Sequence, residues 1–217
     1  MLADLLWPLR CAGCDVTGSA LCVRCAGSLS GGVFEVRRGV MGHGPPVYAL
    51  AGYRATARTL VLAYKERGRR DLARPLGRLV AGVLPWLPGA SADPAGTWWL
   101  VPAPSRWHAA GRRGGSHMLA LARCCAAALA AQNRPAAVAP ALALGRGVAD
   151  SVGLDRPARV ANLAGRMRFR PAGAPAPGTP VVLLDDVVTT GATAAACVRE
   201  LTSAGLVVRA VVALTAT

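Results

Sequence analysis

The sequence is poor in several common residue types. Among its 217 residues, lysine occurs only at Lys65, asparagine only at Asn133 and Asn162, and isoleucine is absent. Acidic residues number 11 against 25 basic ones, which gives a formal net charge of +14, and aromatic residues make up 5%. Such a skew toward Ala, Gly, Arg and Pro is typical of a GC-rich coding sequence, which supplies arginine wherever any cation serves. The net charge still favours a polyanionic ligand, whereas the few aromatic residues argue against a platform on which bases stack.

Long hydrophobic runs are also missing. The alanine-rich run from Leu119 to Ala131 is interrupted by Arg123, and the apolar stretch from Leu5 to Leu9 is too short for a signal peptide. We therefore expect no membrane span and a cytoplasmic location. In that compartment the seven cysteines stay reduced unless they bind a metal ion.

Four of those cysteines form two Cys-x-x-Cys pairs near the start of the sequence. Only seven residues separate the pair Cys11 and Cys14 from the pair Cys22 and Cys25. Four thiolates at this spacing predict one tetrahedral zinc ion with a structural role, because a closed four-cysteine site has no open position for catalysis. A redox-active dithiol and a chance arrangement are the alternatives, although a dithiol needs only one such pair. Metal binding would fold a segment that is too short to build its own core.

The most informative stretch runs from Val181 to Ala194. Four apolar residues, Val181–Leu184, are typical of a strand buried on both faces, and Asp185 and Asp186 follow them. A turn rich in threonine and glycine comes next, and residues 192–204 have helical spacing. We therefore predict a strand that ends at the two acids, in a functional site, and then leads into a helix.

The turn has the chemistry of a phosphate site. The backbone N–H groups from Thr189 to Thr193 are free at the start of the helix, where the helix dipole places about half a positive charge. Three threonine hydroxyls add neutral donors, and Gly191 allows the backbone to approach an anion closely.

The acidic pair extends this interpretation. Asp185 and Asp186 would repel a phosphate unless they met hydroxyl groups or a bridging cation, and a phosphorylated sugar supplies such hydroxyls. Successive side chains of a strand point to opposite faces, so both acids reach one sugar only where the strand curls into the loop. Otherwise one of them has a structural role. An ordinary strand before an acidic turn is the alternative; a receiver domain needs a phosphoacceptor aspartate in a later strand, and no aspartate follows Asp186.

The rest of the chain alternates between strand and helix patterns. The expected elements are a strand at 47–53, helices at 56–67 and 71–84, a strand at 98–104, a helix at 116–131 and a last strand at 206–214. Lys65 lies at the end of a helix, and as the only lysine it is a candidate for function rather than a solvated helix-end cation. Asn162 is singled out on the same ground.

Two basic loops are further candidates. Arg106 lies in the loop that follows the strand at 98–104, the position at which α/β sheets bind their ligands. His108 and His117 are expected to be polar surface or positioning residues, with a catalytic base as the alternative, since the sequence fixes no partner for either. The loop at 147–157, between Arg146 and Arg159, is a candidate lid over the site, with an ordinary surface loop as the alternative.

Together these motifs resemble the ComF/GntX family of phosphoribosyltransferase-like proteins over nearly the whole chain. The stretch from Val181 to Ala194 is similar to the motif with which type I phosphoribosyltransferases bind phosphoribosyl pyrophosphate (PRPP). The other shared features are the four-cysteine start, Lys65-x-x-Gly68, Val101-Pro102-Ala103-Pro104 before a basic loop, and Arg146 followed by Arg159-x-x-Asn162. The chain departs from the family after Arg113, where Gly114-Gly115-Ser116-His117 replaces Gly-Phe-Asn-Gln, and at Ser151, where glutamine is usual.

The resemblance implies an α/β fold in which helices flank a mostly parallel sheet. It places a zinc finger at residues 1–30, a linker at 31–46 and a type I phosphoribosyltransferase-like domain at 47–217. The implied activity transfers ribose 5-phosphate from PRPP, with Mg²⁺, to an unknown acceptor and releases diphosphate. An alternative is a non-catalytic accessory protein of DNA uptake, which binds PRPP as a regulatory ligand and contacts single-stranded DNA or a protein of the competence machinery.

The resemblance also implies a role for each candidate residue. Asp185 and Asp186 lie along the ribose hydroxyls. The 5-phosphate is held by Thr189, Thr190, Gly191, Ala192 and Thr193. The expected contacts of the diphosphate and the rest of the substrate are Lys65, Arg146, Arg106, Arg159 and Asn162.

Overall fold

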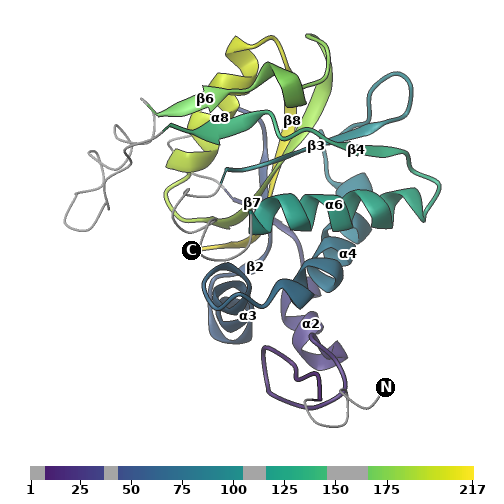
Figure 1. Ribbon diagram of the computed structural model, residues 1–217, viewed down its shortest axis with the longest axis vertical. Coiled ribbons are helices and arrows are strands. Elements are labelled where there is room, and N and C mark those ends of the chain that lie inside the picture. Colours follow the sequence, from purple (N-terminus) through teal and green to yellow (C-terminus); the bar gives the residue numbers. More distant parts are fainter. Residues whose placement is uncertain (1–7, 37–43, 105–115, 146–165) are drawn as a thin grey trace.

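A six-stranded sheet forms the centre of the computed structural model, which describes residues 8–36, 44–104, 116–145 and 166–217. The strand order is β1-β2-β8-β7-β3-β4, and every neighbouring pair is parallel except β1 with β2 (Figure 1). The strands are β1 (Phe34–Glu35), β2 (Val47–Gly52), β3 (Trp98–Pro102), β4 (Ala136–Val138), β7 (Pro180–Val188) and β8 (Val207–Ala216). The expected α/β class with a mostly parallel sheet is confirmed.

Strand β7 lies between β8 and β3 and extends further than the sequence predicts. Its ladder with β8 continues through the acidic pair, since Asp185 pairs with Ala213 and Val187 with Thr215. The prediction that the strand ends at the two acids was therefore wrong. Both carboxylates belong to the strand itself, and the turn begins after Val188.

Helices cover both faces of the sheet. The helices are α2 (Val23–Ser30), α3 (Ala55–Lys65), α4 (Ala73–Val83), α6 (His117–Ala130) and α8 (Ala192–Ser203). Helices α3, α4 and α6 pack on the face that holds Val182 and Leu184 of β7. Helix α8 packs on the opposite face, which holds Val181 and Leu183. This alternation follows from the two-residue period of a strand, and it decides on which face each acid of β7 lies.

The remaining elements are short. An antiparallel pair lies beside α8, and three 3₁₀ turns punctuate the chain. They are β5 (Leu142–Leu144), β6 (Met167–Phe169), η1 (Arg70–Leu72), η2 (Leu84–Trp86) and η3 (Pro171–Gly173). In the part of the chain that the structure describes, no helix has the length and apolar character needed to cross a bilayer. The cytoplasmic location stays a prediction.

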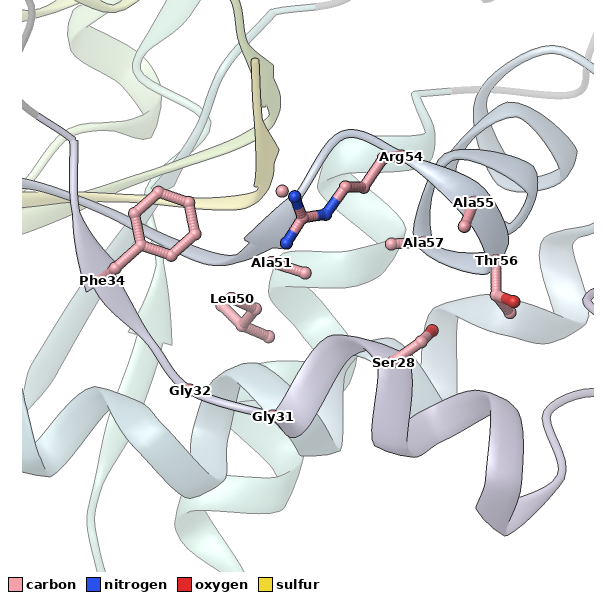
Figure 2. A pocket seen from close by; sticks show the side chains of 11 residues that line it. Ser28, Gly31, Gly32, Phe34, Leu50, Ala51, Arg54, Ala55, Thr56 and Ala57 are labelled. Carbon is pink, nitrogen blue, oxygen red and sulfur yellow. The ribbon is translucent and has the colours of Figure 1, made fainter.

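The amino-terminal segment is joined to the main core. Helix α2 packs against α3 and β2. Cys11, Cys25 and Leu29 belong to the same buried cluster as Leu60 and Tyr64 of α3. Between α2, the end of β2 and the start of α3 a pocket remains (Figure 2). The domain bounds stay a prediction, but the two parts share one hydrophobic cluster.

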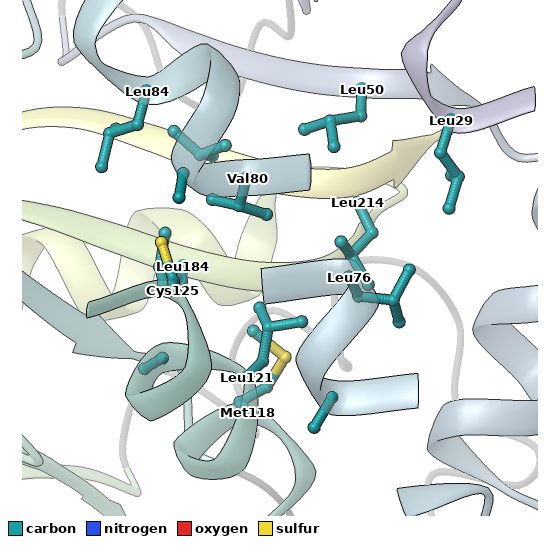
Figure 3. Close-up of a cluster of buried hydrophobic side chains, with 14 of the residues drawn as sticks. Leu29, Leu50, Leu76, Val80, Leu84, Met118, Leu121, Cys125, Leu184 and Leu214 are labelled. Atoms are coloured by element: carbon teal, nitrogen blue, oxygen red, sulfur yellow. The ribbon is translucent and has the colours of Figure 1, made fainter. Parts of the chain in front are cut away.

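The centre of that cluster lies between the sheet and helices α4 and α6, which pack against each other (Figure 3). The two helices approach closely because Gly77 of α4 has no side chain. A Cβ at this position would lie 2.7 Å from Cβ of Cys124 and 2.8 Å from the backbone nitrogen of Cys125. Such contacts leave no room for even one methyl group, so the glycine fixes the distance between the helices.

We expect Gly77→Ala to lower the free energy of unfolding by about 1–3 kcal/mol, the usual cost of overpacking, despite the higher helix propensity of alanine. Gly82→Ala in the same helix is the matched control, because an added Cβ there meets nothing within 4 Å. Urea unfolding followed by circular dichroism measures both variants. Equal stabilisation by the two substitutions would contradict the packing described here.

Candidate functional site

Strand β7, the turn at residues 189–191 and helix α8 form the predicted strand-turn-helix unit. Gly191 has a φ of 82°, in the left-handed region that a residue without a Cβ adopts without strain. The hydroxyl of Thr190 accepts a hydrogen bond from the N–H of Ala192 at 3.3 Å. The N-cap residue Gly191 has no side chain to cap α8, and the N–H groups of a first helical turn have no acceptor within the helix. The turn therefore offers backbone donors to an anion.

A small hollow lies inside this turn. It is lined by Asp185 and residues 187–194 and has a volume of about 20 Å³. That volume admits about one water-sized group, so one oxygen of a phosphate fits inside while the rest lies at the mouth. The hollow stands at the carboxyl end of a central parallel strand, where α/β sheets bind ligands.

Asp185 borders the hollow and lies on the α8 face of the sheet. Its Oδ1 accepts a hydrogen bond of 2.8 Å from the N–H of Asp186, and the residue is 7% exposed. Burial, together with the charge of Asp186, raises the pKa of Asp185 to about 7. Near neutral pH this carboxyl therefore exists in both protonation states.

Asp186 points to the opposite face, where each of its two carboxylate oxygens has a partner. Its Oδ1 lies 2.9 Å from Nζ of Lys65, and its Oδ2 lies 2.7 Å from Nε2 of His117. Although burial works in the opposite direction, His117 and Lys65 lower the pKa of Asp186. This carboxyl stays ionised and holds an ion pair in the interior.

The ion pair is part of a larger network that joins α3, α6 and β7. The hydroxyl of Tyr64 donates to the carbonyl of His117, and the two rings meet edge to face with centroids 5.5 Å apart. Ser116 caps α6 by accepting the N–H of Leu119 at 3.3 Å, which fixes the start of that helix. The side chain of Lys65 is 37% exposed, so its ammonium reaches solvent while it is anchored to Asp186. Despite burial, the charge of Asp186 raises the pKa of Lys65, which keeps the ammonium charged.

The structure thus separates the two acids. Asp185 lies with residues 189–193, whereas Asp186 is turned into the interior with Lys65. The inward contacts of Asp186 agree with the alternative in which one acid is structural, and the roles of both acids stay predictions. The described carboxylate at the hollow is Asp185.

His117 belongs to the network around Asp186, which its sequence pattern does not indicate. A surface position was one expectation for it, and this was wrong, since His117 is 5% exposed and bonded to Asp186. The positioning role, the other expectation, agrees with the observed contacts. Scarcity was the available signal: the chain has three histidines, and this one follows a basic loop.

Several predicted residues lie outside the described part of the chain, and their roles stay predictions. These residues are Arg106, His108, Gly114, Gly115, Arg146, Ser151, Arg159 and Asn162.

The four amino-terminal cysteines form a second candidate site. The Sγ atoms of Cys11, Cys14, Cys22 and Cys25 all lie within 4.8 Å of one another, and those of Cys14 and Cys22 are 3.7 Å apart. A tetrahedral ion with metal–sulfur distances of about 2.3 Å holds its ligands about 3.8 Å apart, which matches this spacing. The turn that carries them is tight, since a Cβ on Gly13 would lie 2.8 Å from Sγ of Cys25. The cluster can hold a metal ion.

The electrostatics of the cluster favour a cation. Although burial opposes it, hydrogen bonds from the N–H groups of Cys22, Gly13 and Cys14 lower the pKa of Cys11 to about 6. Burial and the neighbouring sulfur atoms raise the pKa of Cys25 to about 12, because four thiolates repel one another in this space. A bound cation removes this conflict, since a thiol that coordinates a metal is deprotonated.

Comparisons with known proteins were made for the whole chain. No family model and no curated protein matches it. Among solved structures, UMP synthase of Leishmania donovani matches 88% of this chain and 30% of its own chain, with 20% identity and a TM-score of 0.36. An HPRT variant with glutamic acid at an invariant aspartic acid matches 68% and 65%, with 13% identity and a TM-score of 0.35. The chain spans less than two thirds of each structure, and the function proposed below rests on the geometry of this chain.

The opposite pKa shifts of the two acids predict opposite pH effects on stability. Asp185 is raised from 3.8 to about 7, so its contribution is complete below pH 3.8 and is lost as the pH rises through 7. Asp185→Asn should therefore stabilise the protein more at pH 8 than at pH 5, by about 2 kcal/mol in the free energy of unfolding.

Asp186→Asn is the contrasting variant in the same experiment. The pKa of Asp186 is lowered, so its stabilising contribution is present above pH 3.8 and is lost only in acid. Because Lys65 and His117 lose their partner, we expect this variant to lose about 3–5 kcal/mol at both pH values. Chemical denaturation at pH 5 and pH 8 measures both variants. A difference between Asp185→Asn and wild type that does not change with pH would contradict the assignment.

Proposed function

We propose that this chain binds PRPP and acts as a phosphoribosyltransferase-type protein. The observation that carries the proposal is the hollow at the start of α8, which brings backbone donors and Asp185 together at the carboxyl end of the central strand β7. The rest of the proposed site is built around that hollow.

The 5-phosphate would lie at the mouth of the hollow. The first-turn N–H groups of α8, the helix dipole and the hydroxyl of Thr193 converge there on negative charge. Asp185, in the floor, would accept hydrogen bonds from the ribose hydroxyls when it is ionised. Hydrogen bonds from the sugar hydroxyls would favour the ionised form of Asp185 and so oppose the burial that raises its pKa.

Lys65 is the proposed contact for the diphosphate. One N–H of its ammonium is used by Asp186, and the group has two further donors on a partly exposed side chain. Asp186 and His117 would then act indirectly, by fixing the position and charge of Lys65. Arg106, Arg146, Arg159 and Asn162 remain predicted contacts.

The proposed reaction forms a bond from an acceptor to C1 of the ribose and breaks the bond from C1 to the diphosphate oxygen. The protein would position the two reactants and stabilise the departing diphosphate by preorganised positive charge. Magnesium prefers carboxylate and phosphate oxygens, which Asp185 and PRPP offer, and when bound it would neutralise part of the diphosphate charge. The acceptor is best sought by a screen of nucleobases and amines for diphosphate release.

Calorimetric titration with PRPP and Mg²⁺ tests the proposed site. We expect Asp185→Asn and Thr193→Val each to weaken binding about tenfold or more, the effect of one lost hydrogen bond to a charged group. Thr202→Val is the matched control, because Thr202 lies near the far end of the same helix and is exposed. Wild-type affinity in both site variants, or no binding by the wild-type chain, would rule the site out.

For the cysteine cluster we propose a structural zinc ion. Four sulfur ligands at tetrahedral spacing are the preferred environment of zinc, and they leave no open position for catalysis. Because Cys11 and Cys25 belong to the main buried cluster, the metal would also hold α2 against α3.

Zinc removal is therefore expected to destabilise the whole chain. Cys22→Ser should lose the bound metal, measured as one zinc per chain by elemental analysis, and should lower the melting temperature. Cys124→Ser, in α6 and outside the cluster, is the control that should retain the zinc. A Cys22→Ser protein that melts like wild type would contradict the structural role.

The alternative, an accessory protein that contacts single-stranded DNA, has weaker support. Helices α4 and α6 contain no acidic residue and carry the exposed Arg74, Arg78 and Arg123. Beside them Trp86 is 77% exposed, and the guanidinium of Arg134 lies 5.9 Å from its ring centroid. A single aromatic residue is a small platform for a strand of stacked bases, so we place this role second.

A further inference from the structure

A second pocket lies away from the hollow at β7. It has a volume of about 330 Å³ and opens between α2, β1, the end of β2 and the start of α3 (Figure 2). Its lining residues are Ser28, Gly31, Gly32, Phe34, Leu50, Ala51, Gly52, Arg54, Ala55, Thr56 and Ala57. This volume is at the lower end of the range for small-molecule sites.

The pocket contains one charge. Arg54 is the sole charged residue in its lining, and within the described residues its guanidinium has no hydrogen-bond or ion-pair partner. The side chain folds back over Gly52, since a Cβ there would lie 3.5 Å from Nε of Arg54. Figure 2 shows the guanidinium directed from the start of α3 along the end of β2 toward Phe34. A positive group with five donors thus faces the pocket.

Most of the remaining lining is apolar. Phe34 is 41% exposed, whereas Leu50 and Ala57 are buried in the wall. Leaving an aromatic ring exposed to water is unfavourable. An apolar or aromatic group that covers the ring removes this surface from water and so lowers the free energy. An inorganic anion alone would leave this surface uncovered.

We propose that this pocket binds a small organic carboxylate with an aromatic or aliphatic body. One guanidinium matches one negative charge and accepts a carboxylate through two parallel hydrogen bonds, while a doubly charged phosphate would need a further cation. The exposed ring of Phe34 would cover the apolar body. The N–H groups of Thr56 and Ala57, in the uncapped first turn of α3, add donors next to Arg54.

The position of the pocket relates it to both other sites. Gly52 at the end of β2 pairs with Ala216 of β8, and Ala216 pairs with Val188 at the end of β7. The pocket and the hollow therefore both lie at the carboxyl ends of the parallel strands, with β8 between them. Ser28 of α2, the helix that carries Cys25, and its C-cap residue Gly31 form part of one wall. The amino-terminal segment thereby gains a role in binding in addition to its proposed metal. The site stands independently of PRPP binding.

Titration of the full-length chain with benzoate tests the proposal, with benzamide as the neutral probe of the same shape. We expect saturable binding of benzoate, detected by NMR, with benzamide at least tenfold weaker. Arg54→Leu should weaken benzoate binding at least tenfold, and Phe34→Ala should weaken it several-fold. Arg58→Leu is the matched control: it removes an exposed arginine one turn further along α3, which lies over Tyr53 and does not line the pocket.

Circular dichroism of each variant confirms that it is folded before binding is compared. Equal binding of benzoate and benzamide, or equal loss in Arg54→Leu and Arg58→Leu, would overturn the charge recognition. No binding of benzoate, phenylacetate or hexanoate by the wild-type chain would overturn the site itself. PRPP titrated into Arg54→Leu should bind as it does to wild type, so failure of this site and failure of the proposed function give different results.

Discussion

The buried ion pair of Asp186 is the constraint on which the rest of the structure depends. A carboxylate in the central strand is costly to bury, and here the cost is met by an ammonium from α3 and an imidazole from α6. Because both partners come from helices on one face, the same interaction fixes where those helices stand on the sheet. Tyr64 extends the constraint by linking α3 to the first residue of α6. The pair thus couples helix placement to the charge and position of Lys65.

The strand that carries this pair divides two environments between its faces. On one face Asp186 stays ionised among fixed partners. On the other face Asp185 borders the hollow and has one described hydrogen bond, and its pKa is raised to about 7. Adjacent residues of one strand therefore differ in charge: despite burial, His117 and Lys65 lower the pKa of Asp186, whereas burial raises the pKa of Asp185. The raised pKa of Asp185 weakens its repulsion of an anion at the proposed phosphate site, because the carboxyl is neutral over a wider pH range than an ordinary aspartate.

The amino-terminal segment is integrated with the sheet rather than tethered to it. Its cysteines and Leu29 share the buried cluster of α3, and helix α2 forms a wall of the pocket around Arg54. The free energy of metal binding in such a segment would stabilise the helices packed against it as well as the segment itself. The cluster, the pocket and the hollow are therefore parts of one folded unit.

The sequence by itself determined the strand-turn-helix at Thr189–Thr193 and the four-cysteine cluster, because both depend on residues that are neighbours in the chain. Local periodicity also placed α3, α6 and α8 to within a few residues. The length of β7 was not predictable, since it depends on its ladder with β8. Only the tertiary structure decided that Asp186 points inward to Lys65 and His117, contacts across 121 and 69 positions. A strand's two faces are equivalent until helices pack on them, so no local pattern could assign the roles of its two acids.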